Sequence, residues 1–207
     1  MWWREVAGLG ARLRERLGQV SEIDPCAMIE DDCVLDDSAG PIRIGPRTRV
    51  CAGAIIRGPA WIDADCMIGN QALIRGPVIL GASVKVGFAT EIKQALIGDG
   101  VAIGPMCFVA DSIIEGGAYL GAMVRTSNQR LDRNAISVQQ EGRLVETGCL
   151  KLGCWIGAGA ALGIQVIVLP GRIIAPRTTF EPRITVNRNY PAGHYRIHQT
   201  IEEVKAI

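Results

Sequence analysis

Two cations stand eighteen residues apart in the sequence, Arg75 and Lys93, and Glu91 lies two residues before the lysine. Arginine and lysine supply the permanent positive charge and the N–H donors that an anion such as a phosphate needs. Histidine, whose pKa suits a general base near neutral pH, occurs twice, as His194 and His198. Both histidines lie in the C-terminal tail, so the sequence places no histidine base near the two cations.

The seven cysteines do not follow a metal-binding or disulfide pattern. There is no CxxC motif, and Cys149 and Cys154 are too far from the two histidines to form a recognised zinc pattern. Most cysteines fall at small-residue positions of the repeat described below. We therefore interpret them as reduced, buried thiols of a cytoplasmic protein and predict no metal site.

Composition and charge exclude several partner classes. The net charge is +1 with dispersed basic residues, which gives no indication of a nucleic-acid partner. No apolar run is long enough to span a bilayer, and the charges in MWWREVAGLGARLRERLGQV fall where a signal peptide would need an unbroken apolar core, so we expect none. In residues 1–22 the apolar side chains recur at helical spacing, so an amphipathic helix is predicted, weakened by Gly8, Gly10 and Gly18. We expect it to pack on the rest of the protein or on a neighbouring subunit, with membrane-surface binding as the alternative.

A six-residue repeat dominates the chain. Glycine often follows the repeated aliphatic residue, and a small or β-branched residue often stands four positions after it. The uninterrupted series of aliphatics is Ile44, Val50, Ile56, Ile62, Ile68, Ile74, Leu80, Val86 and Ile92. A period of six fits neither an amphipathic helix nor a long strand, but it fits short strands joined by corners. Each aliphatic then points into a narrow interior, and many coils must stack to bury their faces.

This repeat resembles the hexapeptide-repeat left-handed parallel β-helix, in which three hexapeptides form one triangular coil. The resemblance, rather than the periodicity, implies the left hand. We expect an all-β column over residues 23–180, interrupted by a β-hairpin arm at 127–148 whose turn is Glu141-Gly142. Residues 181–207 lose the rhythm, so we expect an extended tail that ends in a short helix.

Three segments carry a closer family resemblance, VGFATEIKQALIGDG, VADSIIEGGAYLGAMVRTSNQRLD and EGRLVETGCLKLGCWIGAGAALG. They resemble the C-terminal β-helix domain of bifunctional sugar-1-phosphate nucleotidylyltransferases, and most closely the variant with an inserted hairpin. That domain carries glucosamine-1-phosphate acetyltransferase activity. The resemblance implies an acetyl-CoA-dependent sugar acyltransferase that works as a homotrimer on a sugar phosphate or a nucleotide sugar.

The resemblance also assigns the substrate-binding positions. Arg75 and Lys93 match the family's phosphate-binding pair, and Glu91 would orient the lysine. Because one triangular coil contains eighteen residues, we expect the two cations to stack on one outer face, about one strand spacing apart. Phe108 and Tyr119 stand where the family has a tyrosine and an asparagine, so they are candidates for the same substrate site.

The catalytic position departs from the family. The histidine that takes the proton from the sugar amine corresponds to Pro105, which has no side-chain base. Asp111 and His194 are the candidates for a replacement base, although a carboxylate at its ordinary pKa is a poor base for an ammonium group. The protein is therefore predicted to be at most a poor glucosamine-1-phosphate acetyltransferase.

The implied acetyl-CoA site is lined by small residues. Gly121, Ala122, Asn128 and Ala158 would form its wall, although small residues are also what the corners of such a column require. Two alternatives stay open because of Pro105. The chain is either a non-catalytic module that binds a sugar phosphate or nucleotide sugar, or a scaffold subunit for a separate nucleotidylyltransferase chain.

Overall fold

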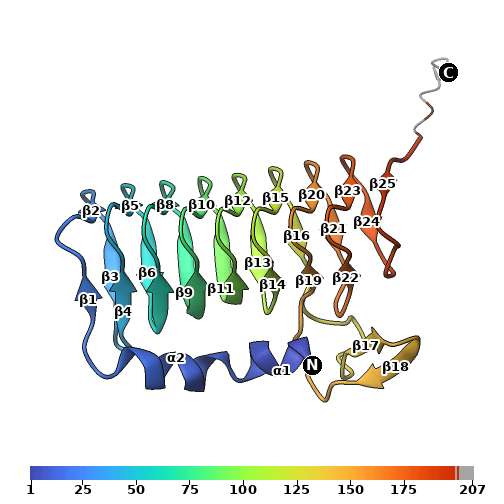
Figure 1. Cartoon of the computed structure of the whole chain (residues 1–207), viewed down its shortest axis with the longest axis horizontal. Helices are drawn as coiled ribbons and strands as arrows, with labels where there is room; N and C mark the ends of the chain where they lie inside the picture. The colour runs from blue at the N-terminus through green and yellow to red at the C-terminus, as the bar shows by residue number, and fades with distance from the viewer. Residues whose placement is uncertain (199, 201–207) are drawn as a thin grey trace, which may run out of the picture.

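The computed structural model describes residues 1–198 and 200 and shows a left-handed parallel β-helix with two helices along its side (Figure 1). Each coil contributes to three sheet faces, which we number in the order the chain visits them. Face 1 contains β1 (Glu22–Ile23), β4 (Ile42–Ile44), β7 (Ala60–Ile62), the second halves of β9 (Leu73–Leu80) and β11 (Glu91–Ile97), β14 (Ile113–Ile114), β19 (Trp155–Ile156) and β22 (Ile173–Ile174).

The other two faces repeat the same parallel pairing. Face 2 contains β2 (Met28–Ile29), β5 (Arg49–Val50), β8 (Met67–Ile68), β10 (Lys85–Val86), β12 (Ala102–Ile103), β15 (Tyr119–Leu120), β20 (Ala161–Leu162), β23 (Thr179–Phe180) and β25 (His194–Tyr195). Face 3 contains β3 (Val34–Asp36), β6 (Ile55–Arg57), the first halves of β9 and β11, β13 (Phe108–Ala110), β16 (Arg125–Thr126), β21 (Ile167–Val168) and β24 (Thr185–Val186). The corners between these faces are called the 1–2, 2–3 and 3–1 corners.

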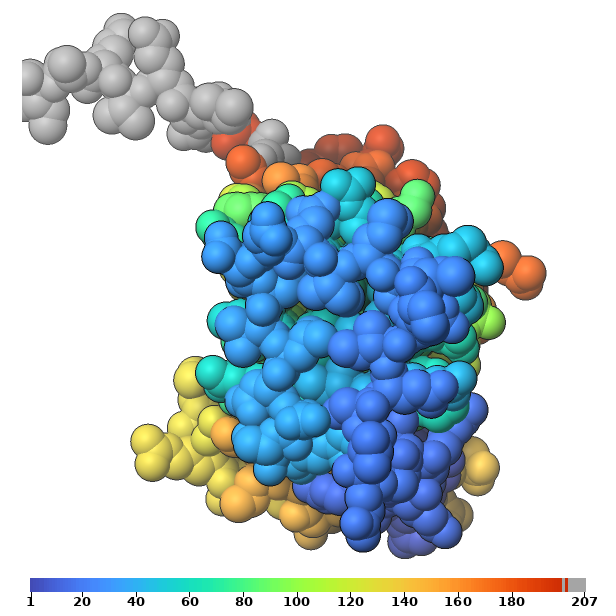
Figure 2. Space-filling view, turned by 90° about the vertical axis from the view of Figure 1, so that its left-hand side faces the viewer, coloured from blue at the N-terminus to red at the C-terminus, as the bar shows by residue number. Residues whose placement is uncertain are grey.

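The repeated aliphatics form the interior of the column, as the six-residue period predicts. Ile44, Ile62, Ile74 and Ile92 are almost completely buried, whereas Ile23, which belongs to the same inward row, is 43% exposed. Ile23 lies in the first coil, which has no further coil beside it in this chain. Figure 2 looks along the column from this end and shows the first coils in blue.

The column continues past residue 180, where the sequence analysis ends it. β24 pairs with β21, and β25 pairs with β23. Phe180 and Val186 continue the six-residue interval from Ile174 and are buried, so the loss of an aliphatic residue at one position does not end the repeat. Tyr195 stacks on the Phe180 ring at 5.0 Å between centroids and covers the interior at this end. The short helix predicted at the end of the tail lies outside the described residues.

The N-terminal helix is divided into α1 (Trp2–Ala7) and α2 (Leu9–Leu17), which are separated by Gly8. Both pack on the chain's own column: Leu9 and Leu13 are fully buried against face 1. The guanidinium of Arg16 lies 3.8 Å from the centroid of the Trp61 ring, which projects from β7. The apolar side of the helix is therefore already covered by face 1. Among the described residues no helix is long and apolar enough to cross a membrane.

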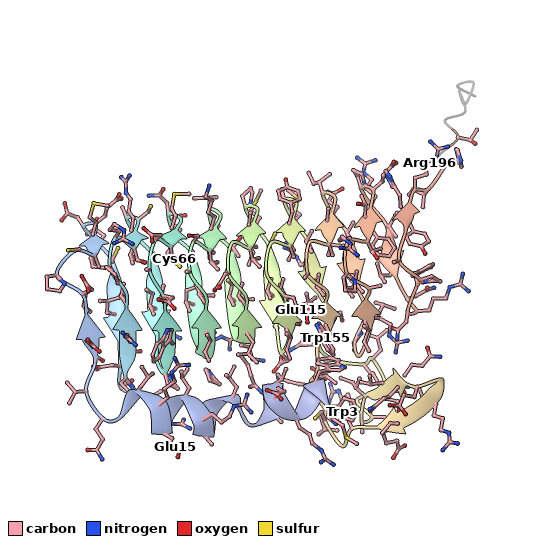
Figure 3. The ribbon with its side chains drawn as sticks, in the orientation of Figure 1. Trp3, Glu15, Cys66, Glu115, Trp155 and Arg196 are labelled. Carbon is pink, nitrogen blue, oxygen red and sulfur yellow. The ribbon has the colours of Figure 1, made fainter. Side chains whose placement is uncertain are left out.

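The predicted hairpin arm is confirmed as the antiparallel pair β17 (Ser137–Gln140) and β18 (Arg143–Glu146). It is inserted at the 3–1 corner and folds back toward α1. Val138 is buried in a small second core with Trp2 and Trp3 of α1, and Trp155 of face 1 packs against that core. Figure 3 labels Trp3 and Trp155 at this junction. The arm, the first helix and face 1 thus form one packed unit.

Candidate active site

A row of three cations runs along face 3. Lys93 pairs in register with Arg75, and Arg75 pairs in register with Arg57 on the preceding coil. Neighbouring strands lie about 4.8 Å apart, so the predicted stacking of Arg75 and Lys93 on one face is confirmed. Arg57 was not predicted, although it stands eighteen residues before Arg75 and the coil length could have identified it. Its Nε lies 3.8 Å from Asp36 Oδ2.

The other two cations are also paired with carboxylates. The guanidinium of Arg75 donates to Glu91 Oε1, with Nε at 3.1 Å, and Lys93 Nζ lies 3.2 Å from Asp111 Oδ2. The two pairs differ in exposure. The side chains of Arg75 and Glu91 are 43% and 30% exposed, whereas those of Lys93 and Asp111 are 17% and 2% exposed. One pair is therefore a surface pair, and the other neutralises a buried carboxylate.

Asp111 is the centre of a buried polar network. Its Oδ2 accepts hydrogen bonds from Lys93 Nζ and from Asn128 Nδ2. Its backbone N–H donates to Lys93 O at 2.9 Å, and its carbonyl accepts from Gly153 N–H at 2.8 Å. At φ 50° it occupies the left-handed region, in a one-residue 3–1 corner that Gln94 forms on the coil before. Because its carboxylate is buried and already accepts two hydrogen bonds, Asp111 positions Lys93 and Asn128 and is not placed to take a proton from a substrate.

Pro105 is exposed at the 2–3 corner, three residues before Phe108. Phe108 pairs in register with Glu91, so its ring lies on face 3 beside the cation row. Tyr119 is instead on face 2, where it pairs with Ala102 and Ala161. Face 3 therefore brings Arg75, Glu91, Lys93 and Phe108 together, and Tyr119 lies on a different side of the same column.

Neither His194 nor Cys107 is placed to act as a base at the Pro105 corner. His194 is in β25 on face 2, and three register steps separate it from Tyr119. Its Nε2 lies 3.0 Å from Glu181 Oε1. Within one chain it does not reach face 3. Cys107 is two residues from Pro105, but its thiol contacts Gly121 O at 3.1 Å and burial raises its pKa, which disfavours the thiolate.

The four small residues predicted to hold acetyl-CoA lie at three different corners. Gly121 and Ala122 are at the 2–3 corner, Asn128 is at the 3–1 corner and Ala158 is at the 1–2 corner. The Ala158 N–H already donates to Glu115 Oε2 at 2.9 Å. A Cβ on Gly121 would lie 2.8 Å from Ile164 N, so close stacking of coils explains this glycine. One copy of the chain cannot surround a single ligand with all four residues.

An apolar strip that the sequence analysis did not identify follows the 2–3 corner. It consists of Phe88, Pro105, Met106, Ala122 and Ile164, from successive coils. Phe88 and Ile164 are 48% and 43% exposed. Apolar side chains gathered on one edge are typical of a surface that a partner or ligand covers. Among the described residues no group of three His, Cys, Asp or Glu side chains is placed to hold a metal ion.

Comparison with known proteins identifies the family. The family model for the GMPPB C-terminal domain matches residues 56–207. The uncharacterized acetyltransferase YaiX of Escherichia coli O6:K15:H31 is 47% identical over 203 residues, which cover 97% of this chain and 88% of that protein. A bifunctional sugar-1-phosphate nucleotidylyltransferase/acetyltransferase of Sulfurisphaera tokodaii is 31% identical over 156 residues, which cover 75% of this chain and 39% of that protein.

A solved structure, the UDP-N-acetylglucosamine acyltransferase of Campylobacter jejuni, matches with a TM-score of 0.47 and 16% identity, covering 79% of this chain and 68% of that chain. The family model matches more than half of the chain, and YaiX is 47% identical over 97% of it. The chain therefore belongs to the family of the GMPPB C-terminal domain, made of hexapeptide-repeat proteins related to the acetyltransferase domain of bifunctional sugar-1-phosphate nucleotidylyltransferases.

Proposed function

We propose that this protein transfers an acetyl group from acetyl-CoA to a sugar phosphate or nucleotide sugar that binds on face 3. The observation that carries the proposal is the contiguous group of Arg75, Glu91, Lys93 and Phe108 on that face. Relatives that carry the name acetyltransferase support the reaction class.

The cation row has donors left for a phosphate. An ammonium group carries three N–H bonds and a guanidinium five. Lys93 uses one of them on Asp111, and Arg75 uses two on Glu91. Because the row is neutral as it stands, a phosphate must displace a carboxylate to gain a net attraction. Glu91 is the more exposed of the two carboxylates, so we expect a phosphate to take its place beside Arg75 while Asp111 stays in position.

The chain's own contribution to the reaction is binding and orientation. Acetyl-CoA would supply an activated thioester for transfer. Arg75 and Lys93 would hold the phosphate of the acceptor, and Phe108 would offer an apolar surface one coil further along. Pro105 accepts no proton, so the proton of the attacking amine or hydroxyl passes to water. Orientation of two reactants alone gives a useful rate, which fits a slow enzyme.

A homotrimer would complete the site. The candidate acetyl-CoA residues lie at three corners of one chain, and the apolar strip at the 2–3 corner is uncovered. Parallel columns that pack side by side would cover that strip and bring different corners of different copies together. Light scattering at micromolar concentration should give three times the chain mass, and a stable monomer would exclude this assembly.

The absence of a base at Pro105 favours a second candidate function. In it the chain binds a sugar phosphate or nucleotide sugar without reaction, or acts as a scaffold for a separate nucleotidylyltransferase chain. We also propose a cytoplasmic location, because all seven cysteines are free thiols.

The test combines binding with turnover. Thermal shift with acetyl-CoA, glucosamine 1-phosphate and UDP-N-acetylglucosamine should identify the bound class, and chromatographic detection of free CoA should show transfer. Arg75→Met should remove phosphate binding, whereas Lys85→Met, which removes an exposed charge from face 2, should not. Binding without CoA release would establish the non-catalytic module. Binding of none of these ligands by the wild-type protein would refute the transferase and the non-catalytic binding module and leave only the scaffold.

A further inference from the structure

A cavity lies at the root of the arm, on the 3–1 corner and beyond the coil that holds Asp111. Its volume is about 580 Å³, within the range of small-molecule sites. Its wall combines the loop that enters the arm with the last coils of face 3. Its polar lining includes Ser127, Arg130, Asp132 and Arg172, and its apolar lining includes Leu131 and Ile136. Because none of them takes part in the Arg75–Lys93 row, this cavity is independent of the function proposed above.

Arg172 is the unusual group in this cavity. It is half-buried, its Nε donates to Pro170 O at 3.1 Å, and its Nη1 lies 3.4 Å from Asn187 O. Within residues 1–198 and 200 it has no carboxylate partner. A half-buried guanidinium held only by carbonyl oxygens keeps an uncompensated positive charge, which is unfavourable unless an anion joins it.

The acid beside the cavity is already occupied. Asp132 accepts both arms of the Arg130 guanidinium, with Nε to Oδ1 at 2.8 Å, and also the Asn134 N–H at 3.2 Å. Because Asp132 is already paired with Arg130, it does not neutralise Arg172. Burial, and then the charge of Arg130, lower the pKa of Arg172, which agrees with a cation that lacks an anionic partner.

The rest of the wall is suited to an apolar group. Ile136 is buried and Leu169 and Pro170 line the cavity beside it. Leu131, at the rim, is completely exposed to solvent, so its side chain is available to cover a ligand. Ser127 and Ser137 add hydroxyl groups that can donate to an oxyanion.

We propose that this arm-root cavity binds a small molecule that carries one oxyanion, a carboxylate or a phosphate, on an apolar body. The oxyanion pairs with Arg172, and the apolar body lies between Leu131, Ile136 and Leu169. The arm closes one side of the cavity and packs on α1 through Val138. A ligand in this cavity therefore contacts both the arm and the column and stabilises the connection between them.

The experiment is calorimetric titration of the full chain with phenyl phosphate and with benzoate. Inorganic phosphate lacks the apolar body, and benzyl alcohol lacks the charge. We expect either phenyl phosphate or benzoate to bind at least tenfold more tightly than both controls, and the stronger of the two identifies the oxyanion. Arg172→Gln should weaken that binding about 10-fold to 100-fold, because a hydrogen-bonded charge is lost. Arg177→Gln, an exposed arginine of the neighbouring corner, should change it less than twofold.

Two further variants keep the proposal falsifiable. Leu131→Ser cannot disturb the core because Leu131 is fully exposed, and it should weaken the aromatic probe about 3-fold to 10-fold. Arg75→Met, which removes a cation of the row from an exposed pair, should leave the binding unchanged within twofold. The proposal is overturned if Arg172→Gln binds the probe like the wild type, if the probes bind no better than benzyl alcohol, or if Arg75→Met abolishes binding, since the probe would then occupy the cation row.

Discussion

Replacing Lys93 by methionine tests whether the buried network or the surface pair stabilises face 3. Methionine keeps the apolar stem of the lysine and removes only its charge. Asp111, 2% exposed, then keeps Asn128 as its remaining side-chain partner. Breaking a fully buried pair from one side costs about 3–5 kcal/mol. Lys93 is 17% exposed and Asn128 stays bonded, so we expect the free energy of unfolding to fall by about 2–3 kcal/mol.

Arg75→Met is the matched control on the neighbouring coil. It removes the same charge from a pair whose members are 43% and 30% exposed. Exposed ion pairs contribute about 0–1 kcal/mol. The two variants should therefore differ by about 2 kcal/mol in the free energy of unfolding, although the residues pair in register and both lose one cation.

Urea denaturation followed by tryptophan fluorescence and by circular dichroism measures both variants, with coincident transitions as the check on two-state unfolding. The double variant Lys93→Met/Asp111→Asn should lose less free energy of unfolding than Lys93→Met and Asp111→Asn lose in sum, because no buried charge is left without its partner. If Lys93→Met costs no more than Arg75→Met, or if the double variant is additive, the network does not stabilise the column and the reasoning fails.

Three other outcomes follow from the structure. Pro105→His combined with Phe108→Tyr should raise the rate of CoA release with glucosamine 1-phosphate by about 10²-fold to 10⁴-fold, the usual contribution of a general base; an unchanged rate would show that the corner is not the proton-transfer position. Burial raises the pKa of the Cys154 thiol to about 12 from an ordinary value of 9.0, so its stabilising effect is complete below pH 9 and is lost as the pH rises toward 12. The stability of the wild type relative to Cys154→Ala in urea should accordingly fall by about 2–3 kcal/mol between pH 8 and pH 11, and a constant difference would contradict the burial argument. Leu9→Ala should cost about 2–5 kcal/mol because Leu9 is fully buried on face 1, whereas Val20→Ala, at an exposed position, should cost almost nothing; equal values would mean that α2 does not contribute to the fold.

The coils could be predicted from the sequence because their period is a local property. An inward residue every sixth position, followed by glycine, describes one strand and one corner, and stacking repeats that unit. The same local rule predicted that Arg75 and Lys93 share a face. The shift of the series at Ile97 also has a local cause. The corner formed by Gly76-Pro77 in β9 is replaced by the single residue Gln94 in β11, so the coil loses one residue.

Contacts between distant segments could not be predicted in this way. The packing of Val138 on Trp2, and of Leu9 on face 1, joins segments that no repeat relates. The corner at which a small residue lies depends on every preceding coil length and on the insertion, so the repeat alone does not show that Asn128 and Ala158 lie at different corners. The carboxylate partners of the cations were also missed, because Glu91 and Asp111 meet them across coils and at different depths.

The burial of Asp111 changes what the presence of Lys93 can mean. A lysine beside a buried carboxylate stabilises the fold whether or not a ligand binds, so Lys93 alone is weak support for a phosphate site. Arg75 contributes little to stability, because its pair with Glu91 is partly exposed to solvent. Arg75 also has N–H donors that are not used by Glu91, so we assign ligand binding to Arg75 rather than to Lys93. If Arg75→Met leaves stability intact and removes phosphate binding, the row is a binding site built on a structural lysine.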